Sequence, residues 1–499
     1  MDKSICAAVS LAIVWVCCVP VGGVSAAGEK VEAAASAKPE FKTGRIIRKV
    51  VSRGDPEQSY ALYLPSKYDP KKKWPILYGF SPGARGVNPV YLFQPAAEKY
   101  GWIVVGSNNS RNGPWQPIAA AIAAILKDTE ARLSIDRSRR YTTGFSGGAR
   151  VGFHVALANK FAGTVPVGAG LPNRRGKLEF GKLKVFSICG RNDFNHAELL
   201  RLERRLNSAG VRNRMATFEG GHQWPKRDLC GAALRYMELL WQLEREKPEK
   251  PEKPEKPDRA PVARLLEAEL SDAEKLLGTK GQLMRAHGRL KELAELCDDG
   301  RFKKRLGEVE ASAGFRKEQA LAERVREIRK RLEEVKDPEK RFARSVKLYR
   351  EFIAGNAGSE AAFNLEVMLR ASGRQMAASG AILMQRKDYR RAEVYLRRAR
   401  IFAPGNSSLA YNLACALARN GKKDEALAAL ADSVRLGFKD FNHIRNDADL
   451  ASLRDDPRYR KLLGLKKQDA GAKGPPVGKA QLPAPGEGGE AEDRAVPLP

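Results

Sequence analysis

The chain has 499 residues, more than one domain commonly holds, and 43% of them are apolar, which suffices for packed cores. The net charge is +30 at pH 7. Because Lys and Arg mostly alternate with Glu and Asp in both halves, this predicts a solvated basic surface, with attraction to acidic polymers as the alternative. No aromatic-rich signature accompanies the charge, so a nucleic-acid partner is not expected.

The first 26 residues predict a cleaved export signal. Lys3 is followed by an apolar run and then by a small-residue site for cleavage before Ala27. The run is shorter than a membrane span, and no later segment is long and apolar enough to be one. We therefore expect a secreted or periplasmic protein that is not an integral membrane protein. Cys17 and Cys18 leave a lipid anchor as the alternative.

Changes in composition divide the rest of the chain. Prolines at every third position of a Lys-Pro-Glu run forbid a helix and favour a stiff, extended spacer. The last residues are rich in Gly, Pro and Ala and have little to bury. The expected segments are a flexible lead-in over 27–42, an α/β domain over 43–246, the linker over 247–258, a helical region over 259–371, helical repeats over 372–465 and a disordered tail over 466–499.

The α/β domain alternates short apolar runs with helical segments. The expected strands lie at 45–51, 60–65, 74–80, 102–107, 140–145, 163–169, 184–189 and 214–219, and the expected helices at 92–101, 117–133, 147–161, 197–210 and 232–247. The first two strands predict an antiparallel opening, and the later runs are typical of strands buried on both faces. The fold class is therefore α/β, with a largely parallel sheet between helices and ligands bound at the carboxyl ends of the strands.

The helical half shows an internal repeat. Two segments align with Ala392 and Ala426 in equivalent places, 34 residues apart. This period indicates stacked helix pairs, and the segment resembles tetratricopeptide repeats. Two repeats rarely suffice for stability, so we expect flanking helices to complete the stack. The resemblance implies a concave face that holds a peptide or protein partner.

Four cysteines remain after the export signal, and they lie far apart: Cys189, Cys230, Cys297 and Cys415. They form no C-x-x-C pair, so we expect no zinc site. Cys189 and Cys230 fall in the same domain. They either form a disulfide or stand as small buried apolar residues.

The stretch RYTTGFSGGAR, residues 140–150, carries the pattern G-x-S-x-G around Ser146. It ends an expected strand and opens an expected helix, which is the context of a sharp turn that exposes a nucleophilic serine. Gly144 and Gly148 relieve crowding between that strand and helix, and the helix N-terminus favours an anion. Ser146 is therefore the candidate nucleophile.

An activated serine needs a base and a carboxylate that orients the base. His222 stands in a Gly-rich loop after the last strand, and Asp193 follows the strand before it, which gives the chain order Ser–acid–His. Asp193 has a second interpretation as a helix N-cap. Of the other histidines in this domain, His154 is expected to pack inside its helix. His196 could line the site but directly follows the loop of the candidate acid.

The developing oxyanion needs two N–H donors, each worth roughly 3–4 kcal/mol of barrier. Gly147, which follows the nucleophile, supplies one. The second is expected from Phe80 or Ser81, because Pro82 has no N–H. The residues expected to line the substrate cleft are Ser81, Asn109, Arg111, Asn112, Trp115 and Trp224. For the polar members of the loop after the fourth strand, the alternative is that they only hold the loop together.

This constellation resembles the α/β-hydrolase fold. Within it, the phrases YALYLPSKYDPKKKWPILYGF, IDRSRRYTTGFSGGAR and GGHQWP are most similar to secreted esterases grouped with polyhydroxybutyrate depolymerases and feruloyl esterases. The resemblance implies hydrolysis of carboxylic esters through an acyl-enzyme, without metal or cofactor, with short acyl groups on polysaccharide as the expected substrates. One departure is Tyr78-Gly79, where such esterases usually carry His-Gly. The alternatives are a serine peptidase of the same fold, or a repeat adaptor with an inactive hydrolase domain.

Overall fold

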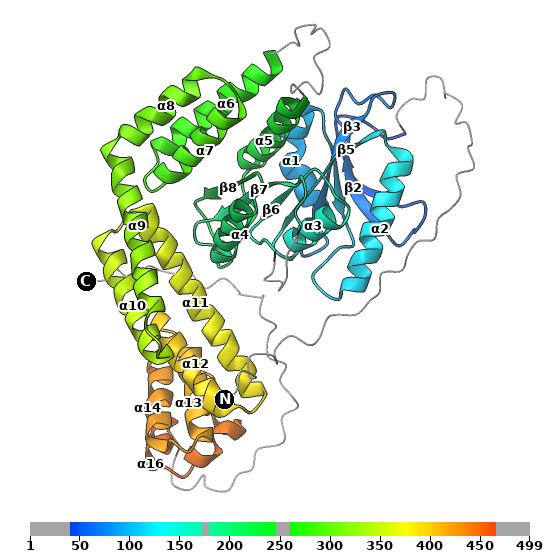
Figure 1. Cartoon of the computed structure of the whole chain (residues 1–499). Coiled ribbons are helices and arrows are strands. Elements are labelled where there is room, and N and C mark those ends of the chain that lie inside the picture. The colour runs from blue at the N-terminus through cyan, green and yellow to red at the C-terminus, as the bar shows by residue number, and fades with distance from the viewer. Residues whose placement is uncertain (1–39, 172–178, 246–259, 466–499) are drawn as a thin grey trace, which may run out of the picture.

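The structure, a computed structural model, describes residues 40–171, 179–245 and 260–465. It has an α/β part that ends at Arg245 and an all-helical part that begins at Ala260 (Figure 1). The expected export signal, linker and tail, and most of the lead-in, lie outside the described residues. The last lead-in residues pack onto the α/β part, where Phe41 contacts the core and Glu40 pairs with Arg132 at 2.7 Å.

Eight strands form one sheet in the order β1-β2-β4-β3-β5-β6-β7-β8. Their bounds are β1 Ile46–Val51, β2 Ser59–Tyr63, β3 Trp74–Phe80, β4 Ile103–Ser107, β5 Ile135–Phe145, β6 Gly163–Val167, β7 Lys184–Gly190 and β8 Asn213–Phe218. All eight expected strands are confirmed. The antiparallel opening is confirmed too, since β1 pairs with β2 and β2 with β4 antiparallel, while the pairs from β4 to β8 are parallel.

Helices cover both faces of the sheet, as expected. Their bounds are α1 Val87–Tyr100, α2 Trp115–Arg132, α3 Gly147–Ala158, α4 His196–Ser208 and α5 Arg227–Arg245. Apolar residues of α2, α3 and α4 fill one core against the sheet, and those of α1 and α5 fill a second core on the opposite face. The strand order and the two helical layers are those of the α/β-hydrolase fold.

The second part is a chain of helices. Their bounds are α6 Ala260–Leu277, α7 Leu283–Leu296, α8 Gly300–Ala311, α9 Ala313–Glu333, α10 Pro338–Gly355, α11 Glu360–Gln385, α12 Tyr389–Phe402, α13 Ser407–Arg419, α14 Lys423–Arg435, α15 Phe441–Asn446, the 3-10 helix η1 Ala448–Leu453 and α16 Pro457–Leu462. The boundary expected between residues 371 and 372 falls inside the continuous helix α11. None of the described helices combines the length and apolar character of a membrane span.

The helices that carry the internal repeat pack on one another in sequence. α12 and α14 contain Ala392 and Ala426 in equivalent places, and both alanines are fully buried. Gly380 lets α11 and α12 approach closely, because a Cβ there would lie 2.7 Å from Leu396 Cγ. The tetratricopeptide assignment itself stays a prediction.

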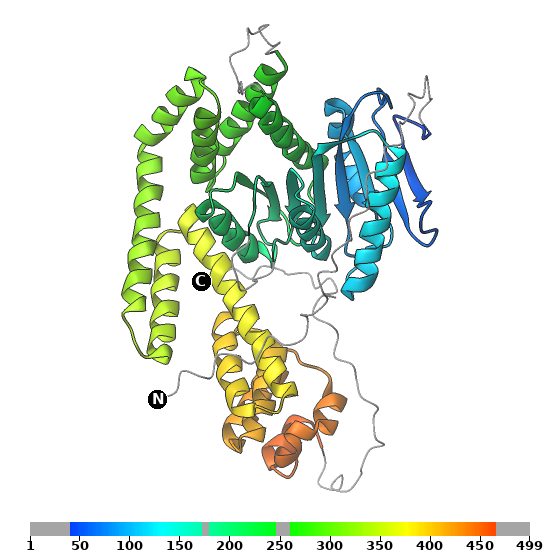
Figure 2. The ribbon, with the colours of Figure 1, turned by 45° about the vertical axis from the view of Figure 1, so that its right-hand side comes forward.

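The two parts share an interface. Leu239 and Leu243 of α5 pack in one apolar cluster with residues of α6, α7 and α8. Val367 of α11 is only 3% exposed and belongs to a core cluster of the α/β part. As Figure 2 shows, α6–α11 curve along one side of the α/β part, and α12–α16 project beyond it. The helical part is therefore docked on the α/β part, which the composition of the linker does not reveal.

Buried charges reinforce this interface. Arg214 of β8 pairs with Glu269 of α6 and, at 2.7 Å, with Glu292 of α7. Arg235 of α5 also binds Glu269, at 2.8 Å. Burial raises the pKa of Glu269, but the charges of Arg214, Arg289 and Arg235 outweigh it and hold that pKa at about 2. Glu269 is therefore an ionised, fully enclosed carboxylate that binds both parts of the chain.

Candidate active site

Ser146 lies on a sharp turn between β5 and α3. Its backbone has φ 53° and ψ −120°, a conformation that costs energy for any residue but glycine. The turn is held by the Ser146 N–H, which donates to the Val167 carbonyl at 2.9 Å. Only glycine fits at position 144, because a Cβ there would lie 2.3 Å from the Gly148 carbonyl oxygen. The turn sets the serine side chain at the carboxyl end of the sheet.

Three candidate side chains come together there. Ser146 Oγ lies 2.8 Å from His222 Nε2, and His222 Nδ1 lies 2.9 and 3.0 Å from the two Asp193 carboxylate oxygens. Because a carboxylate only accepts, Nδ1 carries the hydrogen and Nε2 is free to accept from the serine hydroxyl. Asp193 is 4% exposed and also accepts from the Asn195 N–H at 2.7 Å. The expected serine, base and acid therefore form one hydrogen-bonded chain.

The imidazole of His222 is held between two aromatic rings. The ring of Phe145 lies 4.6 Å from it, centroid to centroid, and the ring of Phe194 lies 4.1 Å from it. Trp224 stacks on Phe145 in turn, at 5.5 Å. Phe145 and Phe194 were not predicted from the sequence as site residues, although each directly neighbours a candidate residue. Both rings therefore pack against the histidine that reaches Ser146.

The expected oxyanion donors lie beside the turn. Gly148 packs against the end of β3, since a Cβ there would meet the Phe80 carbonyl oxygen at 2.3 Å and the Ser81 nitrogen at 3.0 Å. The peptide between Phe80 and Ser81 is thus fixed next to Gly148, the residue that follows Gly147. Tyr78, which replaces the usual histidine, points into the core, where its hydroxyl lies 2.9 Å from Thr129 Oγ1.

The other expected cleft residues divide into two groups. Asn109 uses both side-chain polar atoms to bind the backbone of Ser59 and Glu57 at 2.9 Å, so it holds its loop, and Ser81 is buried. Asn112 lies over the serine turn, because a Cβ on Gly147 would fall 1.8 Å from its Oδ1. Of the residues expected to line the cleft, Arg111, Asn112 and Trp115 are exposed.

The remaining histidines and cysteines have structural surroundings. His154 packs in α3, edge-on to Trp115. His196 is fully buried, and burial lowers its pKa to about 4. Cys189 on β7 and Cys230 on α5 are both free and belong to cores on opposite faces of the sheet, so they form no disulfide. Among the described residues, no three His, Cys, Asp or Glu side chains converge as metal ligands would.

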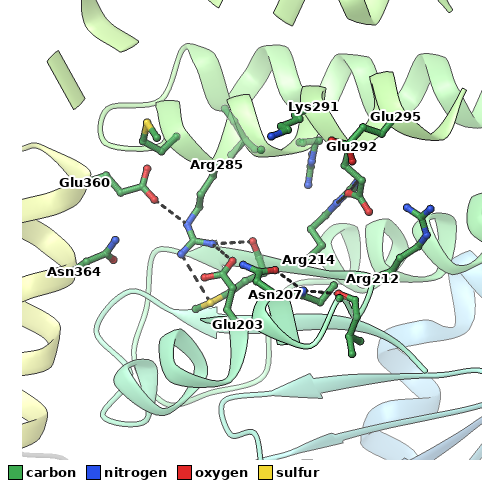
Figure 3. Close-up of a pocket in the computed structure, with 18 residues that line it drawn as sticks. Glu203, Asn207, Arg212, Arg214, Arg285, Lys291, Glu292, Glu295, Glu360 and Asn364 are labelled. Atoms are coloured by element: carbon green, nitrogen blue, oxygen red, sulfur yellow. Dashed lines mark hydrogen bonds and ion pairs between the residues drawn. The ribbon is translucent and has the colours of Figure 1, made fainter. Parts of the chain in front are cut away.

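A separate polar cavity of about 830 Å³ lies between the two parts of the chain (Figure 3). Arg285 projects into it from α7 and lies 3.5 Å from Glu203 of α4 and 3.6 Å from Glu360 of α11. Burial raises the pKa of Glu360 to about 7, although Arg285 opposes the rise. Neither Ser146 nor His222 lines this cavity, so it belongs to the interface and not to the serine site.

Known proteins resemble parts of the chain. No family profile matches it. A "probable feruloyl esterase C" of Aspergillus oryzae is 30% identical over 115 residues, which are 20% of this chain and 42% of that protein, and one of Aspergillus clavatus is 28% identical over 114 residues. The chain thus spans about two fifths of the length of these curated relatives.

Solved structures also match part of the chain. A ferulic acid esterase of Anaeromyces mucronatus, solved with ferulic acid, has 17% identity and a TM-score of 0.30, and the match covers 39% of this chain and 90% of that one. A fluorophosphonate-binding serine hydrolase of Staphylococcus aureus has 16% identity and a TM-score of 0.33, with 39% and 99% covered.

Proposed function

We propose that the protein is a secreted serine hydrolase that cleaves carboxylic esters through an acyl-enzyme. The observation that carries this proposal is the hydrogen-bonded chain from Ser146 Oγ through His222 to the buried Asp193, at 2.8 and 2.9 Å. The identity to feruloyl esterases over 115 residues supports the same reaction class. Ser146 is then the nucleophile, His222 the general base and Asp193 the residue that orients the base.

The geometry assigns a role in the reaction to each of the three side chains. Ser146 Oγ attacks the ester carbonyl carbon while its proton passes to His222 Nε2. Asp193 stabilises the imidazolium through the Nδ1–H bond and keeps the ring in the tautomer that accepts at Nε2. His222 gives the proton to the leaving alcohol, and water then repeats the cycle on the acyl-enzyme to release the acid.

The negative charge that forms on the carbonyl oxygen meets the N–H groups of Gly147 and Phe80 in this mechanism. Gly147 opens α3, so its N–H is not needed for helix hydrogen bonds and the helix dipole favours an anion there. The close packing of Gly148 fixes the peptide between Phe80 and Ser81, whose N–H belongs to Ser81, so Ser81 is the alternative second donor. Loss of one such donor costs roughly 100-fold to 1,000-fold in kcat.

The surroundings suggest the class of ester. Phe145, Phe194 and Trp224 form an aromatic wall around His222. Arg111 and Trp115 stand exposed on the loop whose Asn112 lies over the serine turn. We propose short or aromatic acyl groups on a polysaccharide as substrates, with the acyl group against the aromatic wall and the sugar near the exposed loop.

The test uses the full chain. Its hydrolysis of acetyl, feruloyl and longer-chain esters, and of peptides, is measured beside that of Ser146→Ala and labelling by a fluorophosphonate. We expect ester hydrolysis and labelling in the wild type and neither in the variant. Labelling that persists in Ser146→Ala, or equal rates for both proteins on all esters, would falsify the proposal. Turnover of peptides but not of esters would assign a peptidase instead.

Two further expectations remain proposals. The export signal, which lies outside the described residues, gives secretion or a periplasmic location, with a lipid anchor as the alternative. The successive packing of α11 to α14 supports a repeat stack that binds a peptide or protein partner.

A further inference from the structure

Helix α11 belongs to the helical part of the chain but lies against the loop that carries Asp193. Its residue Phe363 stands edge-on to the buried ring of His196, at 5.4 Å between centroids, and the guanidinium of Arg191 lies 4.0 Å over its ring. One turn later Val367 is buried in the core of the α/β part. These three contacts place one face of α11 on the segment from Arg191 to His196, which we call the acid loop.

A second contact reaches the end of the acid loop that is closest to the base. Arg374, three turns beyond Phe363 on α11, donates from Nη2 to the Phe194 carbonyl oxygen at 2.8 Å. The ring of Phe194 is the one that stacks on His222 at 4.1 Å. A direct chain of contacts therefore runs from α11 through Phe194 to the base.

From the other side, the acid loop is held by the loop of His222. The N–H groups of Arg191 and Asn192 donate at 2.9 Å to the carbonyls of Phe218 and Gly220. Gly190 packs so closely on the loop of His222 that a Cβ on Gly190 would lie 2.3 Å from the Gly221 carbonyl oxygen. The two loops form one unit inside the α/β part, and α11 is the element that covers its outer side.

We propose that α11 is a positioning element of the active site, in which Phe363 and Arg374 hold the acid loop so that Asp193 and Phe194 keep His222 aimed at Ser146. The inference rests on the proposed function. It gives the helical part a role in the rate of the reaction, beyond any partner that its repeats bind. Neither Phe363 nor Arg374 is required to touch the substrate.

The expected kinetic effect follows from geometry. A displacement of about 1 Å in a catalytic group can cost roughly 100-fold in rate, whereas substrate binding does not depend on the angle of the imidazole. Phe363→Ala and Arg374→Gln should therefore lower kcat by about tenfold or more and leave KM within about twofold. Phe363→Tyr keeps the ring and should restore kcat.

The pH profile of kcat/KM distinguishes a positioning role from a merely structural one. A less well aligned Asp193 stabilises the imidazolium less, so the acid limb of kcat/KM moves to lower pH. Arg374 of α11 carries a charge that acts on Asp193, and Arg191 of the acid loop pairs with Glu219 at 3.2 Å. Because Arg374→Gln removes a charge near Asp193 as well as a contact with the acid loop, Phe363→Ala is the variant for this measurement.

The matched control is Arg370→Gln, which removes an exposed arginine of α11 that forms an ion pair with Glu366 of the same helix, at 3.7 Å. We expect its kcat and pH profile to equal those of the wild type. A kcat within about twofold of wild type in both Phe363→Ala and Arg374→Gln overturns the proposal, and so does an equal loss in the control.

Hydrogen exchange separates this inference from the proposed function, because it needs no substrate. In Phe363→Ala, amides of residues 190–196 and 220–223 should exchange faster than in the wild type, while those of the distant strand β2 stay unchanged. If the wild type hydrolyses no ester, the proposed function fails, and this measurement still decides whether α11 holds the acid loop. Unchanged exchange in both segments means that it does not.

Discussion

The backbone of Ser146 has a strained conformation. At φ 53° and ψ −120° its Cβ meets the steric penalty that glycine escapes, of order 1–3 kcal/mol. The hydrogen bond from Ser146 N to Val167 O and the close packing of Gly144 on Gly148 keep the turn in this form. This strain accompanies the turn that directs the hydroxyl toward His222. It can be measured by comparing two variants of Ser146, one that keeps the Cβ and one that lacks it.

We expect Ser146→Gly to be more stable than Ser146→Ala, although both abolish activity. Alanine keeps the Cβ and therefore the strain, whereas glycine relieves it and loses only about 0.5–1 kcal/mol through the greater freedom of the unfolded chain. The free energy of unfolding from urea titration should be higher for Ser146→Gly by about 1 kcal/mol. Equal stabilities of the two variants would show that the turn carries no strain at this residue.

The chain order of Ser146, Asp193 and His222 was enough to predict which side chains meet, because each follows its own parallel strand and those ends share one edge of the sheet. The aromatic rings around His222 were not predictable in this way. Phe194 reaches the imidazole through the shape of the acid loop, and no periodic pattern encodes that shape. Asn109, expected in the cleft, instead binds the backbone of Ser59 and Glu57.

Among the elements, α5, α6, α7 and β8 are joined by buried charges. Such a network contributes little net stability when intact, but the loss of one partner leaves another charge enclosed without compensation. Glu269 is 1% exposed and binds both Arg214 and Arg235. Removing its charge therefore leaves two buried arginines without the carboxylate that they share.

Glu269→Gln should therefore lower the free energy of unfolding by about 3–5 kcal/mol at pH 7. Glu267→Gln on the same helix removes an exposed partner of Arg301 and should change it by less than about 1 kcal/mol. Because the pKa of Glu269 in the folded protein is about 2, below its ordinary 4.5, its contribution is present above pH 4.5 and is lost as the pH falls toward 2. Similar unfolding midpoints for the two variants at pH 7 would contradict this role.

Glu360 at the start of α11 has the opposite pH dependence. Its pKa of about 7 lies above the ordinary 4.5, so the folded protein holds a proton that the unfolded chain releases. As the pH rises from 4.5 to 7, the free energy of unfolding should therefore fall by up to about 1.4 kcal/mol per pH unit. Glu360→Gln should remove this fall. Thermal unfolding at a series of pH values checks it, with the exposed Glu366→Gln as control. Parallel curves for wild type and Glu360→Gln would contradict the expectation.

Helix boundaries show where sequence patterns are informative. The expected strands and helices of the α/β part lie close to the observed ones because short apolar runs and Gly-rich turns mark their ends. In the helical part, the boundary placed at residues 371 and 372 falls within α11. The repeat pattern begins there, but the helix starts about three turns upstream, at a Ser359 cap that accepts from Ala362 N.

At the scale of the whole molecule, the Lys-Pro-Glu run predicted a stiff, extended spacer between two parts. Composition describes the linker and says nothing of the surfaces on either side of it. Those surfaces are complementary: Leu239 and Leu243 of α5 are buried by α6–α8, and Val367 of α11 enters the core of the α/β part. The α/β part alone would expose Leu239 and Leu243, and the core surface that Val367 covers, to water.

A chain limited to residues 40–245 should therefore be less stable than the full protein, with a thermal midpoint lower by at least about 5 °C. A chain that ends at Arg386 keeps α6–α11, so its α/β part should unfold close to the full-length midpoint and its active site should stay intact. Differential scanning fluorimetry and ester hydrolysis compare the three forms. An isolated α/β part as stable as the full chain would mean that the shared cluster contributes nothing.

Because of the shared interface, the two parts do not need a covalent connection in order to stay together. Halves that bury apolar and charged groups in each other recognise one another as the subunits of a heterodimer do. A single cut between Arg245 and Ala260 would then leave a nicked but assembled enzyme, in which the intact backbone had supplied only a high local concentration. Expressed as two separate polypeptides, the halves would complement each other, with α11 delivered to the acid loop in trans.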